Sequence, residues 1–298
     1  MTQTQEKTDS GLAAQTGISP TLLVAIEQQF PTDQRIIHDD LALQILPPGS
    51  RIFVRLTRIS GIRNLMVRAT DKQANGLWSG IMCRKRYIDV KVAEAAAGLV
   101  ETVVNLGAGY DTRVYRLPSL ANVPAWEVDQ PANIEAKRSN LQKTLGEIPA
   151  HVTLVPIDFN RQELGPVLAA HGYAANTKTF FIWEAVTQYL TEAGVRQTFD
   201  FLAQAPAGSR LAFTYVRKDF VEGKNLYEQE TLYKRVVVKE KAWHFGFDPE
   251  EVADFLSEYG WRMVEHLGYD DLAERYVKPT GRELPFMAIE RMVYAEKL

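Results

Sequence analysis

The chain has 298 residues, of which 46% are hydrophobic, and a formal net charge of −3. This length and apolar share suffice for a substantial core, and the acidic balance gives no basic footprint for non-specific nucleic-acid binding. The single cysteine excludes an internal disulfide and is typical of a reducing compartment. No apolar run approaches the ~20 residues of a membrane span, and the N-terminus resembles neither a signal nor a transit peptide. We therefore expect a cytoplasmic globular protein with no nucleic-acid or membrane partner.

The N-terminal part is predicted to be helical. Apolar residues recur at helical spacing in residues 21–30 and 52–65. Arginines lie between the apolar residues of the second stretch and predict a solvated helix face: Arg51, Arg55, Arg58 and Arg63. Residues 76–80 begin and end with glycine, which indicates a break. We predict a helical cap over residues 1–80 and a second domain over residues 81–298.

The rest of the chain alternates between short apolar runs and helical segments. The predicted strands are 102–106, 125–128, 152–157, 179–183 and 210–216, and the predicted helices are 90–99, 131–145, 161–171 and 191–205. Strands that alternate with helices of this length predict a parallel α/β sheet with helices on both faces. Two later apolar runs, 261–269 and 286–294, predict an antiparallel pair that closes the sheet.

A long insertion, residues 217–247, follows the fifth predicted strand and is rich in charged and aromatic residues. Open α/β sheets bind ligands beyond the carboxyl ends of their strands, so we expect this insertion to form a lid. Asp248 and Pro249 then predict the start of a capped helix over residues 248–256.

The strongest local signal is the turn Gly107-Ala108-Gly109, which directly follows a buried strand. Glycines at this position allow a tight turn and a close approach of a ligand to the backbone. Asp129 ends the next strand at roughly the 20-residue spacing expected of a ribose-binding acid. Together these features predict a nucleotide-type cofactor site.

The residues after the turn select among nucleotide cofactors. A dinucleotide fingerprint requires a third small residue where this chain has Thr112. Tyr110 and Asp111 also fill the turn, and an acid beside a pyrophosphate is electrostatically unfavourable. An acid beside a cationic amino-acid group is favourable. This pattern favours S-adenosylmethionine (SAM), which carries a sulfonium and an ammonium group and no phosphate.

Four motifs in order carry a resemblance to a known family: LGAGYDTR at 106–113, WEVDQP at 126–131, VPIDFN at 155–160 and FIWEAVTQYL at 181–190. Over residues 80–298 the chain resembles the leucine carboxyl methyltransferase family, which includes protein-phosphatase carboxyl methyltransferases and bacterial polyketide O-methyltransferases. The resemblance is strongest to actinobacterial members. It implies a class I methyltransferase fold, a Rossmann-like and mostly parallel seven-stranded sheet with an antiparallel C-terminal strand.

The resemblance also implies roles in binding SAM. Gly107, Ala108 and Gly109 would face its methionine part, and Asp129 its ribose hydroxyls. Asp158 and Phe159 would hold the adenine. Arg86 or Arg84 would pair with its carboxylate, with a slight preference for Arg86. Asp111 would help to hold the ammonium group, and Glu184 would face the reactive end of the cofactor, unless it forms a structural salt bridge.

The sequence identifies the residues that would bind the methyl acceptor less specifically than those that would bind SAM. Tyr189, Tyr215 and Arg217 are candidates to line the acceptor pocket, and each has core packing or solvent exposure as an alternative. His244 is a candidate general base for a hydroxyl acceptor, or a packed residue. A carboxylate acceptor needs no base, and Arg217 or a cap arginine could anchor it.

The predicted reaction is attack of an acceptor oxygen on the sulfonium methyl group, which releases S-adenosylhomocysteine (SAH). We expect a small-molecule acceptor and no metal, since no histidine or cysteine spacing suggests a metal site. A protein C-terminus as acceptor, a non-catalytic SAM-binding protein and an NAD-dependent oxidoreductase remain as alternatives. The oligomeric state, monomer or homodimer, stays open.

Overall fold

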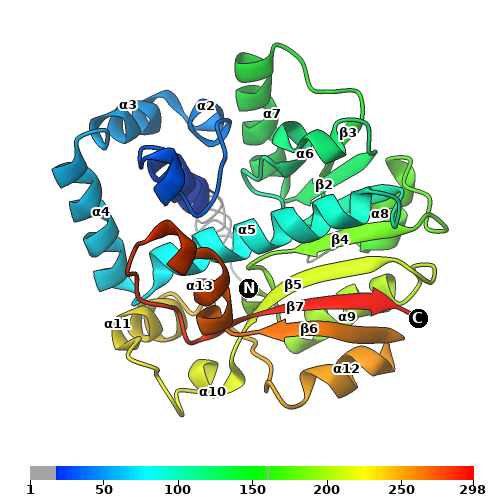
Figure 1. Cartoon of the computed structure of the whole chain (residues 1–298). Coiled ribbons are helices and arrows are strands. Elements are labelled where there is room, and N and C mark those ends of the chain that lie inside the picture. Colours follow the sequence, from blue (N-terminus) through cyan, green and yellow to red (C-terminus); the bar gives the residue numbers. More distant parts are fainter. Residues whose placement is uncertain (1–17, 160) are drawn as a thin grey trace.

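The computed structural model describes residues 18–159 and 161–298. Its centre is a seven-stranded sheet in the order β3-β2-β1-β4-β5-β7-β6 (Figure 1). The strands are β1 (Thr102–Leu106), β2 (Ala125–Asp129), β3 (Val152–Pro156), β4 (Thr179–Trp183), β5 (Arg210–Val216), β6 (Trp261–Leu267) and β7 (Glu290–Lys297). The first five strands pair in parallel, and β7 is antiparallel to both β5 and β6. This confirms the predicted mostly parallel sheet with an antiparallel C-terminal strand.

Helices surround the sheet, and residues 18–27 are helical as well. The helices are α2 (Ala42–Ile45), α3 (Pro48–Leu56), α4 (Ser60–Gln73), α5 (Leu77–Ala96), α6 (Arg113–Arg116), α7 (Pro131–Leu145), α8 (Leu164–Ala170), α9 (Glu192–Leu202), α10 (Lys218–Val221), α11 (Glu230–Tyr233), α12 (Val252–Glu258) and α13 (Tyr269–Tyr276). Thr191 caps α9 as predicted, since its hydroxyl oxygen accepts a hydrogen bond from the N–H of Gly194.

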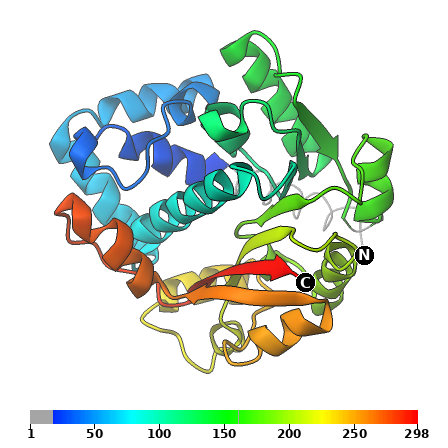
Figure 2. The same cartoon turned by 45° about the vertical axis from the view of Figure 1, so that its right-hand side comes forward.

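The central strands are covered on both faces. Successive side chains of a strand point to opposite sides of a sheet. On β4, Phe180 and Ile182 pack in the cluster that contains α5, whereas Phe181 and Trp183 pack in the cluster that contains α9 and α12. Figure 1 and Figure 2 show α5 along one face and α9 and α12 against the other. Burial of both faces explains why the predicted strands have continuous apolar runs rather than alternating ones.

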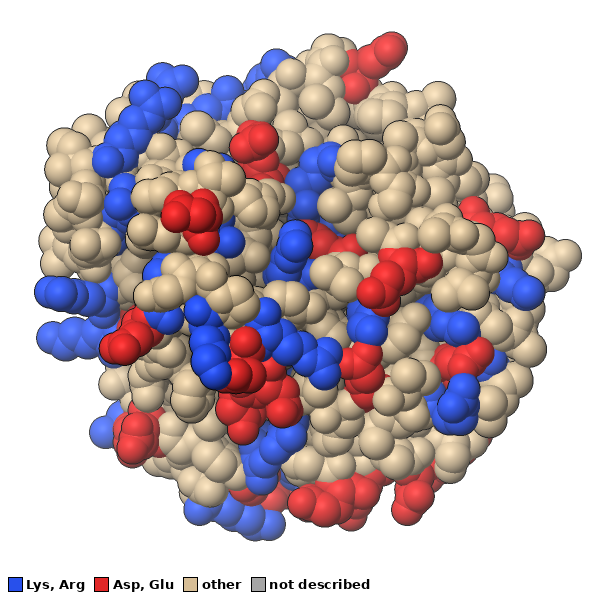
Figure 3. Space-filling view, in the orientation of Figure 1, with Lys and Arg blue, Asp and Glu red and all other residues tan. Residues whose placement is uncertain are grey.

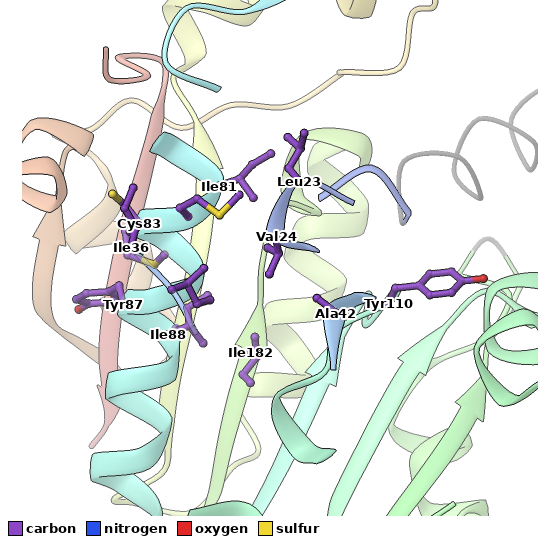
Figure 4. Packing of buried hydrophobic residues seen from close by; sticks show 14 of the residues in the cluster. Leu23, Val24, Ile36, Ala42, Ile81, Cys83, Tyr87, Ile88, Tyr110 and Ile182 are labelled. Carbon is purple, nitrogen blue, oxygen red and sulfur yellow. The ribbon is translucent and has the colours of Figure 1, made fainter. Parts of the chain in front are cut away.

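The N-terminal helices share this core. Val24 of the first helix, Ile81 and Ile88 of α5 and Ile182 of β4 belong to one buried cluster (Figure 4). The predicted break at residues 76–80 is confirmed at Gly76, which has a φ of 74° between α4 and α5, but it does not extend to residue 80, because α5 begins at Leu77 and continues through Gly80. A Cβ atom on Gly80 would lie 3.3 Å from that of Met287, so this glycine serves close packing. The proposed boundary at residue 80 therefore lies inside a helix.

Three other segments differ from the prediction. Residues 52–65 form parts of two helices, since α3 ends at Leu56 and α4 starts at Ser60. Helix α12 starts at Val252 rather than at Asp248. The polar segment before β7 contains α13, whose first turn is fixed by the carboxylate of Asp271 accepting from the N–H of Gly268. Each of these features depends on a local cap or break that the apolar spacing does not reveal.

A fully buried ion pair joins α7 to β2. The Nζ atom of Lys137 lies 2.7 Å from Oε1 of Glu127, and neither side chain is exposed to solvent. The hydroxyl of Tyr115 donates to the other carboxylate oxygen at 2.5 Å. Both charges are therefore satisfied inside the core, where an unpaired charge is costly.

We predict that Lys137→Met lowers the free energy of unfolding at pH 7 by about 3–5 kcal/mol, because it leaves the Glu127 carboxylate without its counter-ion. Denaturant titration measures this loss. The double variant Lys137→Met/Glu127→Gln removes both charges and should recover most of it. A single variant as stable as the parent would contradict the pairing.

Candidate functional site

The glycine turn after β1 has the geometry expected of a ligand cradle. Gly107 and Gly109 both have positive φ angles, 75° and 43°. The N–H groups of Gly107 and Ala108 donate to the carbonyl of Val128 at 2.8 and 3.0 Å. A Cβ atom on Gly107 would overlap the side chain of Val186, which lies on the loop after β4. Both the backbone angle and the close approach therefore require glycine at residue 107.

Asp129 lies beside this turn at the carboxyl end of β2. Its Oδ2 accepts a hydrogen bond from the N–H of Gly109 at 2.6 Å. Its Oδ1 accepts from the N–H of Gln130 and from the side-chain amide of Asn133, both at 2.7 Å. An ionised carboxylate oxygen has two lone pairs, so Oδ2 keeps capacity for a further donor such as a hydroxyl. The carboxylate is thus oriented before any ligand arrives.

Glu184 ends β4 and is surrounded by cations. Arg84 lies 2.9 Å and Lys85 3.2 Å from its Oε1, and Arg113 lies 2.8 Å from its Oε2. Burial alone would raise the pKa of Glu184, but the charges of Lys85, Arg113 and Arg84 outweigh it and hold the pKa well below the ordinary value. Glu184 is therefore ionised at neutral pH and has too low a pKa to act as a general base.

The cations around Glu184 have further acidic partners. Arg84 also pairs with Glu290 at 2.9 Å, and Arg113 pairs with Asp89 at 2.8 Å and with Asp111. Burial would raise the pKa of Asp111, but Arg113 and Lys85 outweigh this effect and lower it. The result is a buried cluster of alternating charges at the carboxyl ends of β1 and β4.

The loop after β4 holds an unusual backbone conformation. Ala185 has a φ of 57°, which is unfavourable for a residue other than glycine. Its N–H donates to Oγ1 of Thr214 on β5 at 2.8 Å, and this bond helps to keep Val186 over Gly107. Strain of this kind gathers at functional sites.

The predicted adenine residues follow β3. Asp129 and this segment are neighbours, because the N–H of Ile157 donates to the carbonyl of Asp129 at 2.9 Å. Asp158 is partly exposed and lies 3.5 Å from the guanidinium of Arg161. Phe159 lines a small cavity together with Leu164 and Leu190. The structure thus places both residues beside the Asp129 end of the site.

The two candidate arginines differ in position. Arg84 lies in the charged cluster, whereas Arg86 forms no ion pair with any residue in 18–159 or 161–298. Helical residues two positions apart point about 200° away from each other, so Arg84 and Arg86 lie on opposite sides of α5. The slight preference for Arg86 is therefore not supported, and Arg84 is the better candidate.

Tyr215 does not reach the site. It is fully buried in the layer of α9 and α12, its hydroxyl lies 2.8 Å from Nε2 of His266, and its ring packs against Phe247. Of the two readings left open for Tyr215, the structure supports core packing, since its side chain lies on the face of the sheet opposite to Thr214.

Arg217 and His244 belong to the insertion. The guanidinium of Arg217 is paired with Asp219 at 3.3 Å and lies over the ring of Tyr227. The backbone N–H of His244 donates to the carbonyl of Gln188 at 2.8 Å, while its side chain is exposed. Gln188 follows Glu184 on the loop after β4, and the backbone N–H of Arg217 donates to the carbonyl of Ile289 at 2.8 Å, directly before Glu290 of the charged cluster. Both residues are thus connected through the backbone to segments that carry the cluster.

Lys85, Asp89, Arg113 and Glu290 also belong to the site and were not predicted. A signal existed for two of them, because Arg113 stands in the quoted turn motif and Lys85 lies between the candidate arginines. Glu290 lies 206 residues from Arg84, and nothing in the local sequence marks their contact.

A match to a family model shows which protein family the chain belongs to. The model of the leucine carboxyl methyltransferase family matches residues 18–203. The chain belongs to this family. The match starts within the N-terminal helices, so membership extends beyond the region 80–298 in which the sequence motifs lie.

Curated relatives agree with this membership. A Bacillus subtilis protein, YktD, named as an inferred SAM-dependent methyltransferase, is 31% identical over 176 residues; the alignment covers 58% of each chain. A Mycolicibacterium paratuberculosis protein named in the same way is 27% identical over 96% of this chain and 93% of its own. Family and relatives together identify the chain as a SAM-dependent methyltransferase.

Solved structures confirm the fold. A DUF574 family protein from Streptomyces avermitilis matches with a TM-score of 0.57 at 12% identity, over 80% of this chain and 91% of its own. A methyltransferase-like protein from Thermobifida fusca matches with the same TM-score at 14% identity, over 79% and 88%. The class I methyltransferase architecture is thus shown. Within the parts of the chain that the structure covers, no helix is long and apolar enough to cross a membrane.

The residues at the site fit SAM by their chemistry. The cofactor offers a ribose diol, an ammonium group and a carboxylate. The site offers the open lone pair of Asp129, the acids Glu184 and Asp111, and the cations Arg84 and Lys85. A zwitterionic ligand is bound by acids beside its ammonium group and by cations beside its carboxylate.

We predict that Asp129→Ala weakens SAH binding about tenfold or more, since a hydrogen bond to a charged group contributes roughly 1.5–3 kcal/mol. Isothermal calorimetry measures the dissociation constant. The matched control is Asp200→Ala, which removes an exposed acid from α9 and should leave it unchanged. Equal affinity of the Asp129 variant and the parent would remove this residue from the site.

The pKa of Glu184 gives a second prediction. Its folded pKa lies below the unfolded value, so its ionisation stabilises the fold above about pH 4.5 and this contribution fades as pH falls further. Glu184→Gln should therefore lower the thermal midpoint strongly at pH 7 and progressively less as the pH falls from about 4 to about 2. Melting curves across this range test the trend. A deficit that is constant with pH would show that charge is not the cause.

Proposed function

We propose that this methyltransferase transfers the methyl group of SAM to an oxygen atom of a small molecule, with a carboxylate favoured over a hydroxyl. The observation that carries the proposal is the charged cluster around Glu184. In it the charges of Lys85, Arg113 and Arg84 hold the pKa of Glu184 well below its ordinary value, so this acid is ionised and cannot act as a general base. A carboxylate is already anionic at pH 7, so it needs orientation rather than a base.

The chain's own residues would hold the cofactor as follows. Gly107, Ala108 and Gly109 leave room beside the backbone, and Asp129 accepts from the ribose. Arg84 and Lys85 receive the carboxylate, and Glu184 with Asp111 receives the ammonium group. Asp158 and Phe159 hold the adenine. When bound, SAM supplies a methyl group already activated by its sulfonium.

The insertion at 217–247 is proposed as the lid of the acceptor site. Its two ends meet in a backbone bridge between Arg217 and Phe247. Its far part touches two other regions: His244 bonds to Gln188, and the side-chain amide of Gln229 donates to the carbonyl of Asn75 at 2.6 Å. The insertion thus spans from the loop after β4 to the junction of α4 and α5. Closure there would exclude water from the acceptor.

A labelling experiment tests the acceptor class. Purified enzyme is incubated with tritium-labelled SAM and extract from the source cells, and the products are separated by size and treated with mild alkali. We expect label in the small-molecule fraction that alkali releases as methanol, because methyl esters hydrolyse and methyl ethers do not. Label in the protein fraction would instead support a carboxyl group of a protein, the chemistry in the family's description.

The other readings have distinct outcomes in the same assay. Alkali-resistant label would identify a hydroxyl acceptor. Calorimetric binding of SAM without transfer to any fraction would support a non-catalytic SAM-binding protein. Enzyme inactivated by Gly107→Val, in which a side chain would overlap Val186, is the control for label that arises without catalysis.

His244 provides a prediction that separates the two oxygen acceptors. If the acceptor is a carboxylate, His244→Ala should leave the transfer rate unchanged, since no proton is removed. With a hydroxyl acceptor, the loss of a general base should slow transfer by about 10²–10⁴-fold. Initial rates at saturating SAM measure the effect, with His171→Ala, a change at an exposed histidine in another region, as the matched control. Slower transfer to a proven carboxylate would contradict the base-free mechanism.

A further inference from the structure

An exposed apolar surface lies on α3, α4 and the link between them. Five large hydrophobic side chains there are 36–65% exposed: Ile52, Phe53, Leu56, Ile59 and Leu65. Residues 18–159 and 161–298 contain twelve such exposed side chains, so five of them fall within fourteen consecutive residues. A concentration of this kind marks a contact surface rather than ordinary surface composition. We call these five residues the apolar face.

The apolar face results from how α3 and α4 pack. Val54 of α3 and Thr57 directly after it are buried, whereas Ile52 and Leu56 lie on the opposite side of α3 and Phe53 lies at its flank. On α4, Arg63 and Val67 are buried, and Leu65 points outward. On α3 the apolar residues Ile52 and Leu56 therefore face away from the rest of the described chain. On α4 the inner side is the more apolar one, and Leu65 is an exposed apolar residue on a mostly polar outer side.

Cations flank the apolar face. Arg55 and Arg58 are exposed beside Leu56 and Ile59, and Arg68 is exposed one helical turn after Leu65. Residues 48–73 contain six arginines and lysines, of which all but Arg63 are at least partly exposed, and a single acid, although the whole chain is acidic. Figure 3 shows Lys and Arg side chains along the edge of the molecule where α3 and α4 lie. The surface is therefore apolar and positively charged together.

We propose that the apolar face and its arginines dock the enzyme on a membrane surface that contains anionic lipids. Helices with exposed apolar residues beside arginines lie in the interface between headgroups and acyl chains, and their cations are attracted to anionic headgroups. The two helices stand at the edge of the molecule in Figure 1 and Figure 2, so a broad surface reaches them without obstruction.

Charge argues against a second copy of the chain as the occupant. A two-fold symmetric interface places the same patch against itself. It would bring the arginines of one copy close to those of the other, and like charges across an interface are unfavourable. The inference departs from the sequence-based expectation of no membrane contact, which rested on the lack of a spanning segment; a peripheral contact needs none.

Vesicle co-sedimentation of the full chain tests the proposal. The vesicles are phosphatidylcholine alone, and phosphatidylcholine with an equal share of phosphatidylglycerol. We expect the enzyme to bind the second kind only and to be released by high salt, because screening weakens the electrostatic part. No binding to the anionic vesicles, or equal binding to both kinds, would overturn the proposal.

Variants locate the contact. Arg55→Glu/Arg58→Glu and Leu56→Ser should each weaken binding to the anionic vesicles about tenfold or more. The matched controls, Lys178→Glu/Lys218→Glu and Val264→Ser, change exposed residues elsewhere and should bind as the parent does. Thermal melts verify that all variants are folded. Parent-like binding by both α3 variants, or a concentration-dependent dimer that Leu56→Ser abolishes, would contradict the assignment.

Discussion

The requirement to keep Glu184 charged inside the protein organises much of the structure. A buried carboxylate is stable only when several opposite charges and hydrogen bonds surround it. Three cations from α5 and α6 meet this need, but each is itself a buried charge. Arg84 therefore requires Glu290 from β7, and Arg113 requires Asp89 and Asp111. One charged residue at the end of β4 thus links four elements that are distant in the sequence.

The network extends into the N-terminal segment. Asp39 accepts a hydrogen bond from the hydroxyl of Thr112 at 2.5 Å and pairs with Arg116, which also pairs with Asp89. Burial raises the pKa of Asp39 although Arg116 and Thr112 oppose this effect. The turn that follows β1 is therefore held from both sides. For this reason the N-terminal helices form part of the site's support, and the family match that begins at residue 18 includes them.

The parts of the fold that the sequence predicted correctly are those with a clear local sequence pattern. The strands 102–106, 179–183 and 210–216 agree with the structure residue for residue, because runs that are apolar on both faces arise only in a covered parallel sheet. It is harder to predict which face of the sheet a given strand residue points to, since a shift of the strand by one residue moves every side chain to the other face. Tyr215 was therefore expected at the site, whereas its neighbour Thr214 bonds to the loop after Glu184. Contacts such as Arg84 with Glu290 depend on the whole topology and leave no local signal.

The segment at residues 52–65 shows a different limit. Its periodicity correctly predicted amphipathic helices, and the usual assumption then places the apolar side in the core and the arginines in water. The structure reverses part of this arrangement: Arg63 is buried, with its guanidinium 4.4 Å from the ring centre of Phe30, while Ile52 and Leu56 are exposed. Periodicity fixes how a helix is divided into sides but not which side contacts the rest of the chain. The apolar residues that this fold leaves exposed on α3 would be accounted for by the membrane contact proposed above.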